Sequence, residues 1–137
     1  MYRLSYCSRQ VGTISLDEAK QIAITAADTN RKYGLSGVLV YNQKYFLQCI
    51  EGSKEMVNEI YHKITKDARH KDLCLLHLDT TADERYFEKW GMGFAAYTKE
   101  NRETFFRYSE KDDFDPYALT GQASIAFLRE ISKREEG

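Results

Sequence analysis

Residues 38–53 read VLVYNQKYFLQCIEGS, and this stretch decides the fold. Val38 to Tyr41 predicts one strand, and Tyr45 to Glu51 predicts a second after the short polar connection Asn42-Gln43-Lys44. Ser53 follows at once as the expected N-cap of a helix. Apolar residues then recur at helical spacing, at Val57, Ile60, Tyr61 and Ile64. The stretch therefore predicts a hairpin that leads directly into a helix.

The flanking segments extend this pattern in both directions. Tyr2 to Ser8 alternates as a strand does, and the capping box Ser15-Leu16-Asp17-Glu18 predicts a helix that ends near Tyr33. On the other side, Leu73 to Leu78 and Met92 to Tyr97 predict two more strands. The order is β-α-β-β-α-β followed by one further strand. This order is typical of an α+β fold, the ferredoxin-like split βαβ sandwich with both helices on one sheet face.

The C-terminal part of the chain has a different texture. It is rich in charge from about Lys99 onward, and a last helix is expected from Leu119 to Lys133. We expect residues 1–97 to form the main domain and residues 98–137 to form a helical extension. Such an extension can cover the second face of the sheet, or it can supply an output or oligomer surface.

Composition and charge exclude several classes of protein. The formal net charge is −1, from 20 Lys and Arg against 21 Asp and Glu, which argues against a strongly basic nucleic-acid-binding protein. With 42% apolar residues the chain is not a disordered tail, and no signal peptide or membrane span is seen. Cys7, Cys49 and Cys74 form no Cys-x-x-Cys motif. Neither disulfides nor a zinc site are expected. The expected location of the protein is the cytoplasm.

Several polar side chains fall where the layer between sheet and helices needs apolar ones. Tyr6 and Gln48 alternate with apolar residues on the inner faces of their strands, and Asn30 falls on the apolar stripe of the first helix. Trp90 and Met92 share a face of the fifth strand. Buried polar groups cost about 1–3 kcal/mol each when they are left without a hydrogen bond. These side chains either satisfy one another or together bind the polar edge of a flat heteroaromatic ligand.

The second helix carries further polar candidates. Lys63, Asp67 and His70 follow Ile60 at spacings that place them beside its apolar stripe, where the simplest interpretation is a solvated helix edge. Glu51 and Asp67 have no evident partner.

Other site chemistries find little support. The three histidines fall on different faces or elements, which disfavours a metal site: His62, His70 and His77. No Gly-rich phosphate loop and no Gly-x-Ser-x-Gly elbow occur. Cys7 and Cys49 alternate with the inward-facing residues and should point away from the crevice. A nucleophilic-cysteine enzyme is therefore not expected.

Five stretches of the chain are recognisable when they are taken together. They are Tyr2-Arg3-Leu4-Ser5-Tyr6, Asn30 to Tyr41, Phe46 to Gly52, Asp67-Ala68-Arg69-His70 and Trp90-Gly91-Met92. In this order and at this spacing they resemble the BLUF family, flavin-binding blue-light sensor domains, across about residues 1–97.

The resemblance implies a non-covalently bound flavin between the two helices, FAD, with FMN and riboflavin left open. It implies that Tyr6 gives an electron and a proton to the excited flavin, and that Gln48 lies between them and rearranges. Trp90 and Met92 match the pair whose exchange of position reports the flavin's state. The positions implied to contact the flavin are Tyr6, Asn30, Gln48, Lys63, Asp67, Arg69 and His70.

The function that the resemblance implies is a non-catalytic blue-light photoreceptor that changes its binding to a downstream protein or to itself. Residues 98–137 are too few for a fused enzyme or transcription-factor domain, so a short stand-alone sensor is expected. The expected partners are flavin, an unidentified regulator or effector and further copies of the chain, without nucleic acid or membrane. The alternatives are a small flavin-dependent redox enzyme, an acylphosphatase-like hydrolase, and a ferredoxin-like oligomeric module without flavin.

Overall fold

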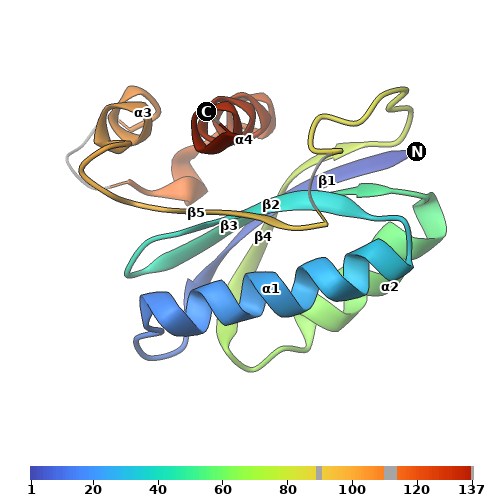
Figure 1. Ribbon diagram of the computed structural model, residues 1–137, viewed down its shortest axis with the longest axis horizontal. Coiled ribbons are helices and arrows are strands. Elements are labelled where there is room, and N and C mark those ends of the chain that lie inside the picture. Colours follow the sequence, from blue (N-terminus) through green and yellow to red (C-terminus); the bar gives the residue numbers. More distant parts are fainter. Residues whose placement is uncertain (89–90, 110–113, 137) are drawn as a thin grey trace.

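Helices cover both faces of a single five-stranded sheet (Figure 1). The computed structural model describes residues 1–88, 91–109 and 114–136. The elements are β1 (Tyr2–Gln10), α1 (Leu16–Lys32), β2 (Ser36–Tyr41), β3 (Tyr45–Gly52), α2 (Lys54–Thr65), β4 (His70–Asp79), β5 (Gly93–Ala96), α3 (Arg102–Arg107), the 3-10 helix η1 (Pro116–Ala118) and α4 (Gly121–Glu136). The strand order is β4-β1-β3-β2-β5, with β2 and β5 parallel and the other pairs antiparallel. The predicted α+β, ferredoxin-like arrangement is confirmed.

Helix α1 begins and ends where the local sequence predicts. Ser15 Oγ accepts a hydrogen bond from the backbone N–H of Glu18 at 3.1 Å, which makes Ser15 the N-cap, and it donates one to Glu18 Oε1 at 3.2 Å. Tyr33 is the C-cap, and Gly34 follows at φ +69°, a left-handed conformation that glycine adopts at little cost. The helix face that meets the sheet carries residues at helical spacing and buries Ala19, Ala23, Ala27 and Asn30.

Helices α1 and α2 cover one face of the sheet, called the inner face from here on (Figure 1). The period of two along β1 turns Leu4 and Tyr6 to this face. In the antiparallel pairing of β1 with β3, Tyr6 lies directly opposite Gln48. Both polar side chains are therefore buried under the helices, at 3% and 6% exposure.

The opposite, outer face of the sheet is covered by α3, η1 and α4 (Figure 1). Cys7 and Cys49 project to this side, as predicted, and join a core with Phe105, Phe127 and Leu128. The ring of Phe105 packs edge-to-face on Phe127, with 5.1 Å between the ring centroids. Both faces of the sheet are thus buried, which explains why β2 is buried along its whole length.

The two outer-face cysteines are expected to resist alkylation. Burial, with a further contribution from Cys74, raises the pKa of the Cys7 thiol to about 12, and burial raises that of Cys49 as well. The thiolate is the reactive form, so both thiols stay unreactive near pH 8. Iodoacetamide followed by peptide mass spectrometry should label the partly exposed Cys74 about tenfold more than either of the others. Equal labelling of all three in the folded protein would contradict this burial, and labelling after denaturation is the control.

Helix α2 ends earlier than the pattern predicted. The prediction that Asp67 and His70 lie along its surface is wrong, because the last helical residue is Thr65. Asp67 Oδ1 accepts the backbone N–H of Arg69 at 3.0 Å, so this short side chain forms a turn in place of another helical turn. Asp67 therefore lies in the connection, and His70 is the first residue of β4. Of the three, only Lys63 belongs to the helix.

Other boundaries differ by a few residues. β5 is shorter than predicted and begins at Gly93, so Met92 lies just before it. The helix α3 is not predicted from the sequence, and the last helix starts at Gly121 and not at Leu119. The reason for the later start is local, because Asp115 caps η1 through the backbone N–H of Tyr117. The 3-10 turn takes up the residues that the helical pattern had claimed.

Candidate functional site

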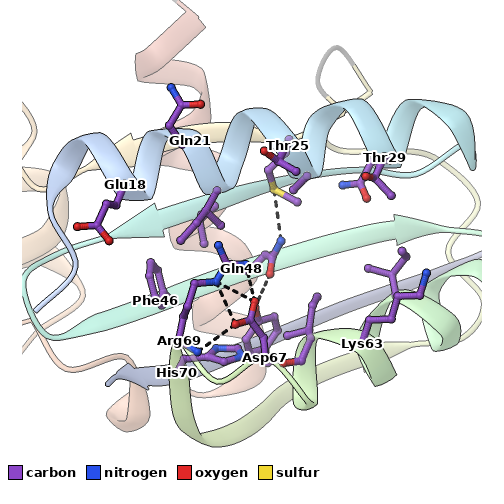
Figure 2. Close-up of a pocket in the computed structure, with 18 of the residues that line it drawn as sticks. Glu18, Gln21, Thr25, Thr29, Phe46, Gln48, Lys63, Asp67, Arg69 and His70 are labelled. Atoms are coloured by element: carbon purple, nitrogen blue, oxygen red, sulfur yellow. Dashed lines mark hydrogen bonds and ion pairs between the residues drawn. The ribbon is translucent and has the colours of Figure 1, made fainter. Parts of the chain in front are cut away.

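A cavity of about 640 Å³ lies between α1, α2 and the inner face of the sheet. Its floor comes from β1, β2 and β3, one wall from α1, and the other from the end of α2 with the turn into β4 (Figure 2). Apolar side chains such as Leu39, Ile22 and Ile60 line much of it, and polar groups are placed at intervals. This size and mixed lining are typical of sites for small molecules and cofactors.

Three side chains form a connected row along the floor of the cavity. Tyr6 Oη donates a hydrogen bond to Gln48 Oε1, and Gln48 Nε2 lies 3.5 Å from the sulfur of Met92 (Figure 2). Burial, followed by a contribution from Tyr61, raises the pKa of the Tyr6 phenol well above its usual value. Tyr6 is therefore a neutral hydrogen-bond donor, and the Gln48 amide joins it to Met92.

Asn30 holds the chain that leads into β5 against the end of α1. Its Nδ2 donates to the carbonyl oxygen of Gly91 at 2.8 Å, and the side chain is only 2% exposed. The approach requires glycine, because a Cβ on Gly91 would lie 2.5 Å from the carbonyl oxygen of Ala27. The neighbouring Met92 is brought to the cavity by the same contact.

Charged groups gather at the α2 side of the cavity. Arg69 Nε lies 3.0 Å from Asp67 Oδ1, and its guanidinium holds the pKa of that carboxyl below its usual range. Figure 2 shows Lys63 on the same side, while Glu18 and Gln21 extend from α1 on the other. The α2 side thus offers two cations and one anion to a bound molecule, whereas α1 offers the carboxylates of Asp17 and Glu18 and the amides of Gln21 and Asn30.

His70 is fixed at the end of the cavity by two hydrogen bonds. Its Nε2 lies 2.7 Å from the carbonyl oxygen of Ile64, which only accepts, so Nε2 carries the hydrogen. Nδ1 lies 2.8 Å from Ser8 Oγ, and in the neutral ring it accepts from that hydroxyl. The ring stands edge-on to Tyr6, at 6.2 Å between the ring centroids. His70 therefore supports the Tyr6 ring as well as lining the cavity.

The predicted site residues that the structure describes all line this one cavity. They are Tyr6, Asn30, Gln48, Lys63, Asp67, Arg69, His70 and Met92. Trp90 lies outside the described residues. Five further polar residues of α1 line the cavity and were not among the predicted site residues: Asp17, Glu18, Gln21, Thr25 and Thr29. Their signal was present, since Gln21 and Thr25 follow Glu18 on one helix face at successive spacings of three and four residues.

The lining suits a flat heteroaromatic ring more than a metal ion. The amides of Asn30 and Gln48 each carry a donor and an acceptor, and the apolar side chains of Leu39 and Phe46 line the cavity with them. Within residues 1–88, 91–109 and 114–136, no group of three metal-ligating side chains occurs. The donor set and the cavity volume therefore fit the ring of a flavin.

Comparisons with known proteins agree with this fit. A family model described as "BLUF: Sensors of blue-light using FAD" matches residues 1–93. The photoactivated adenylate cyclase subunit beta of Euglena longa is 30% identical over 102 residues, which are 74% of this chain and 12% of that protein. The chain thus spans only a small part of the curated relatives it matches.

Two solved structures superpose over nearly the whole chain. The structure titled "BlsA photo-activated state" has a TM-score of 0.80 at 33% identity, covering 94% of this chain and 92% of that one. The structure titled "BlrB - a BLUF protein, dark state structure" has a TM-score of 0.80 at 25% identity, covering 98% and 96%. At 94% and 98% coverage, both matches extend into the C-terminal helices of this chain.

Proposed function

The chain belongs to the BLUF family, the sensors of blue light that use FAD, and we propose that Tyr6, Gln48 and Met92 form its photochemical switch. The observation that carries the proposal is the row of contacts from Tyr6 Oη through the Gln48 amide to the sulfur of Met92. The three groups are a phenol, an amide that can turn over, and a polarisable thioether, and they lie in contact on the floor of the cavity. They can change their hydrogen bonds without breaking covalent bonds.

The cavity residues divide into those that hold the flavin and those that react to its excitation. Asn30, Lys63, Asp67, Arg69 and His70 are proposed to hold it, the first through its amide and the others along the α2 side. When bound there, the flavin supplies blue-light absorption and an electron acceptor in its excited state. FAD is the flavin that the family description names, and it is the cofactor proposed here.

Tyr6 is proposed to be the electron and proton donor. Its burial keeps the phenol neutral, so the proton is in place on Oη before any electron leaves. A phenol that loses an electron becomes strongly acidic, and the hydrogen bond to Gln48 Oε1 gives its proton a direct route. When the electron returns, the proton returns along the same bond. The residue is therefore used repeatedly and is not consumed.

Gln48 is proposed to convert this brief event into a longer-lived change. Its oxygen faces Tyr6 and its nitrogen faces Met92, so turning the amide over exchanges donor for acceptor at both neighbours. A single hydrogen bond contributes about 1 kcal/mol net, enough to shift a two-state equilibrium about fivefold. Met92 then reports the change to β5, which begins one residue later.

The output is proposed to be a change in binding to a partner protein or to a second copy, without catalysis by this chain. Residues 1–97 form the light-sensing unit in this proposal, and residues 98–137 form the output surface. The support is a buried hydrogen bond of 2.8 Å from Ser5, the neighbour of Tyr6, to Ser124 of α4. A cytoplasmic location is part of the proposal and is supported by three free thiols. In the part of the chain that the structure describes, no helix is both long and apolar enough to cross a bilayer.

The proposal is tested first by absorption spectra of the purified protein, in the dark and after a pulse of blue light. We expect a flavin spectrum that shifts slightly to the red after the pulse and recovers in darkness. Bound flavin without any shift would point to a redox enzyme, and failure to bind added flavin would leave an interaction module. Either result would overturn the proposed switch.

A further inference from the structure

A second buried site lies on the outer face of the same strand that carries Gln48. Glu51, near the end of β3, is fully buried and its carboxylate accepts four hydrogen bonds. Two come from side chains, Arg3 Nε at 3.1 Å and Ser36 Oγ at 2.9 Å. The other two come from the backbone N–H groups of Tyr86 at 3.1 Å and Phe87 at 2.7 Å. Residues 84–87 belong to the connection between β4 and β5, and are called segment 84–87 below.

The negative charge of Glu51 is balanced inside the protein. Arg3 is 3% exposed, pairs with Glu51, and has a second carboxylate, that of Asp79, at 3.6 Å. The guanidinium of Arg3 also lies 3.5 Å from the centre of the Tyr86 ring. The ion pair is thus formed against segment 84–87 itself, and the segment closes it from solvent.

Arg85 attaches the same segment at a second point. Its guanidinium donates to the carbonyl oxygen of Gly34 at 2.6 Å and to Ser36 Oγ at 2.8 Å, near the start of β2. Unlike Arg3, this side chain reaches from the segment to the sheet and remains partly exposed. Glu51 reaches from the sheet to the segment, and Arg85 reaches from the segment to the sheet. Together they fix segment 84–87 onto the start of β2 and the end of β3.

The position of this segment bears on the switch because the chain continues from it to Met92. Glu51 and Gln48 project from opposite faces of β3, three residues apart. Glu51 holds the chain at Phe87 on the outer face, and Gln48 contacts it at Met92 on the inner face. Between them, Asn30 holds Gly91. Glu51 therefore fixes the chain five residues before Met92, and Asn30 fixes it one residue before.

We infer that Glu51 is a positioning residue of the light switch, fixing segment 84–87 so that Met92 meets the Gln48 amide in one defined position. The inference rests on the proposed function, since it assigns to Glu51 the placement of that switch. A carboxylate suits this task because it offers two acceptor oxygens to four donors, whereas an amide would present an N–H to some of them.

The test compares substitutions that differ in which contact to segment 84–87 they remove. Glu51→Gln removes the carboxylate, and Glu51→Asp keeps it one methylene shorter as the conservative variant. Because breaking a buried ion pair can prevent folding, Arg85→Gln provides a second way to loosen the segment while leaving Arg3 and Glu51 intact. Asp79→Asn is the matched control, since it removes the outer carboxylate of the ion cluster but no contact to the segment.

Two readouts separate positioning from general stability, and both are taken well below each variant's unfolding temperature. Dark recovery after a blue pulse should be about fivefold faster in Glu51→Gln and Arg85→Gln, and within about twofold of the wild type in Asp79→Asn. The dark-recovery rate of Glu51→Asp should lie between those of the wild type and Glu51→Gln. Amide hydrogen exchange in the dark at Tyr86 and Phe87 should be about tenfold faster in Glu51→Gln than in Asp79→Asn.

Recovery within about twofold of the wild type in both Glu51→Gln and Arg85→Gln would overturn the inference. If Glu51→Gln does not fold, Arg85→Gln alone decides. The exchange measurement needs no light, so it tests the anchoring even where the wild type shows no photocycle. A wild type without a red shift counts against the proposed function, whereas unchanged exchange in Glu51→Gln counts against the role of Glu51 itself.

Discussion

Tyr6→Phe is expected to bind flavin as the wild type does and to lose the light-induced red shift entirely. Phenylalanine keeps the ring that packs edge-to-face on Tyr61, with 5.7 Å between the ring centroids, and edge-on to His70. The cavity therefore keeps its shape and its affinity for flavin. What the variant lacks is Oη, which carries the proton and is the only donor to Gln48 Oε1 among the described residues. A benzene ring is also far harder to oxidise than a phenol.

The measurement is the absorption difference between light and dark at equal flavin occupancy. Tyr61→Phe is the matched control, because Tyr61 is a second tyrosine in ring contact with Tyr6 and, among the described residues, makes no hydrogen bond to Gln48. It should keep the red shift. A normal shift in Tyr6→Phe would remove Tyr6 from the mechanism, and loss of the shift in both variants would show that packing and not the hydroxyl is what matters.

The inner-face site could be predicted from the sequence because strand alternation determines it locally. The period of two assigns Tyr6 and Gln48 to the same face as their apolar neighbours, whatever strand each one pairs with. The register that sets them directly opposite each other depends on pairing between β1 and β3, which the alternation does not specify. The resemblance to BLUF proteins supplied what the pattern lacked, namely that the two side chains meet at a flavin.

The contacts of Glu51 could not be predicted in the same way. Its partners come from the first strand, the second strand and a connection 35 residues away, and none of these follows from local spacing. In the sequence, Glu51 has no evident partner, although in the structure it is among the most buried residues. The end of α2 illustrates the same limit, because the Asp67 side chain competes with the helix for the backbone N–H of Arg69.

Gln48→Leu is expected to bind flavin and to show no red shift, although Tyr6 is intact and still able to give up an electron. Leucine is close to glutamine in size, so the floor beneath the cavity stays filled. It cannot accept from Tyr6 Oη or donate toward the sulfur of Met92, so no group remains whose turning could store the light-driven change. The buried phenol loses its acceptor, and this should lower the free energy of unfolding by about 1–3 kcal/mol.

This variant separates the electron donor from the element that records its action. Transient absorption should still detect rapid quenching of the excited flavin in Gln48→Leu, whereas Tyr6→Phe should prolong the excited state. Gln21→Leu is the matched control, because it removes an amide that lines the same cavity from α1 and lies outside the row from Tyr6 to Met92. It should keep the red shift. A stable red shift in Gln48→Leu would mean that the long-lived change resides elsewhere in the cavity, and the amide between Tyr6 and Met92 would then be a structural contact only.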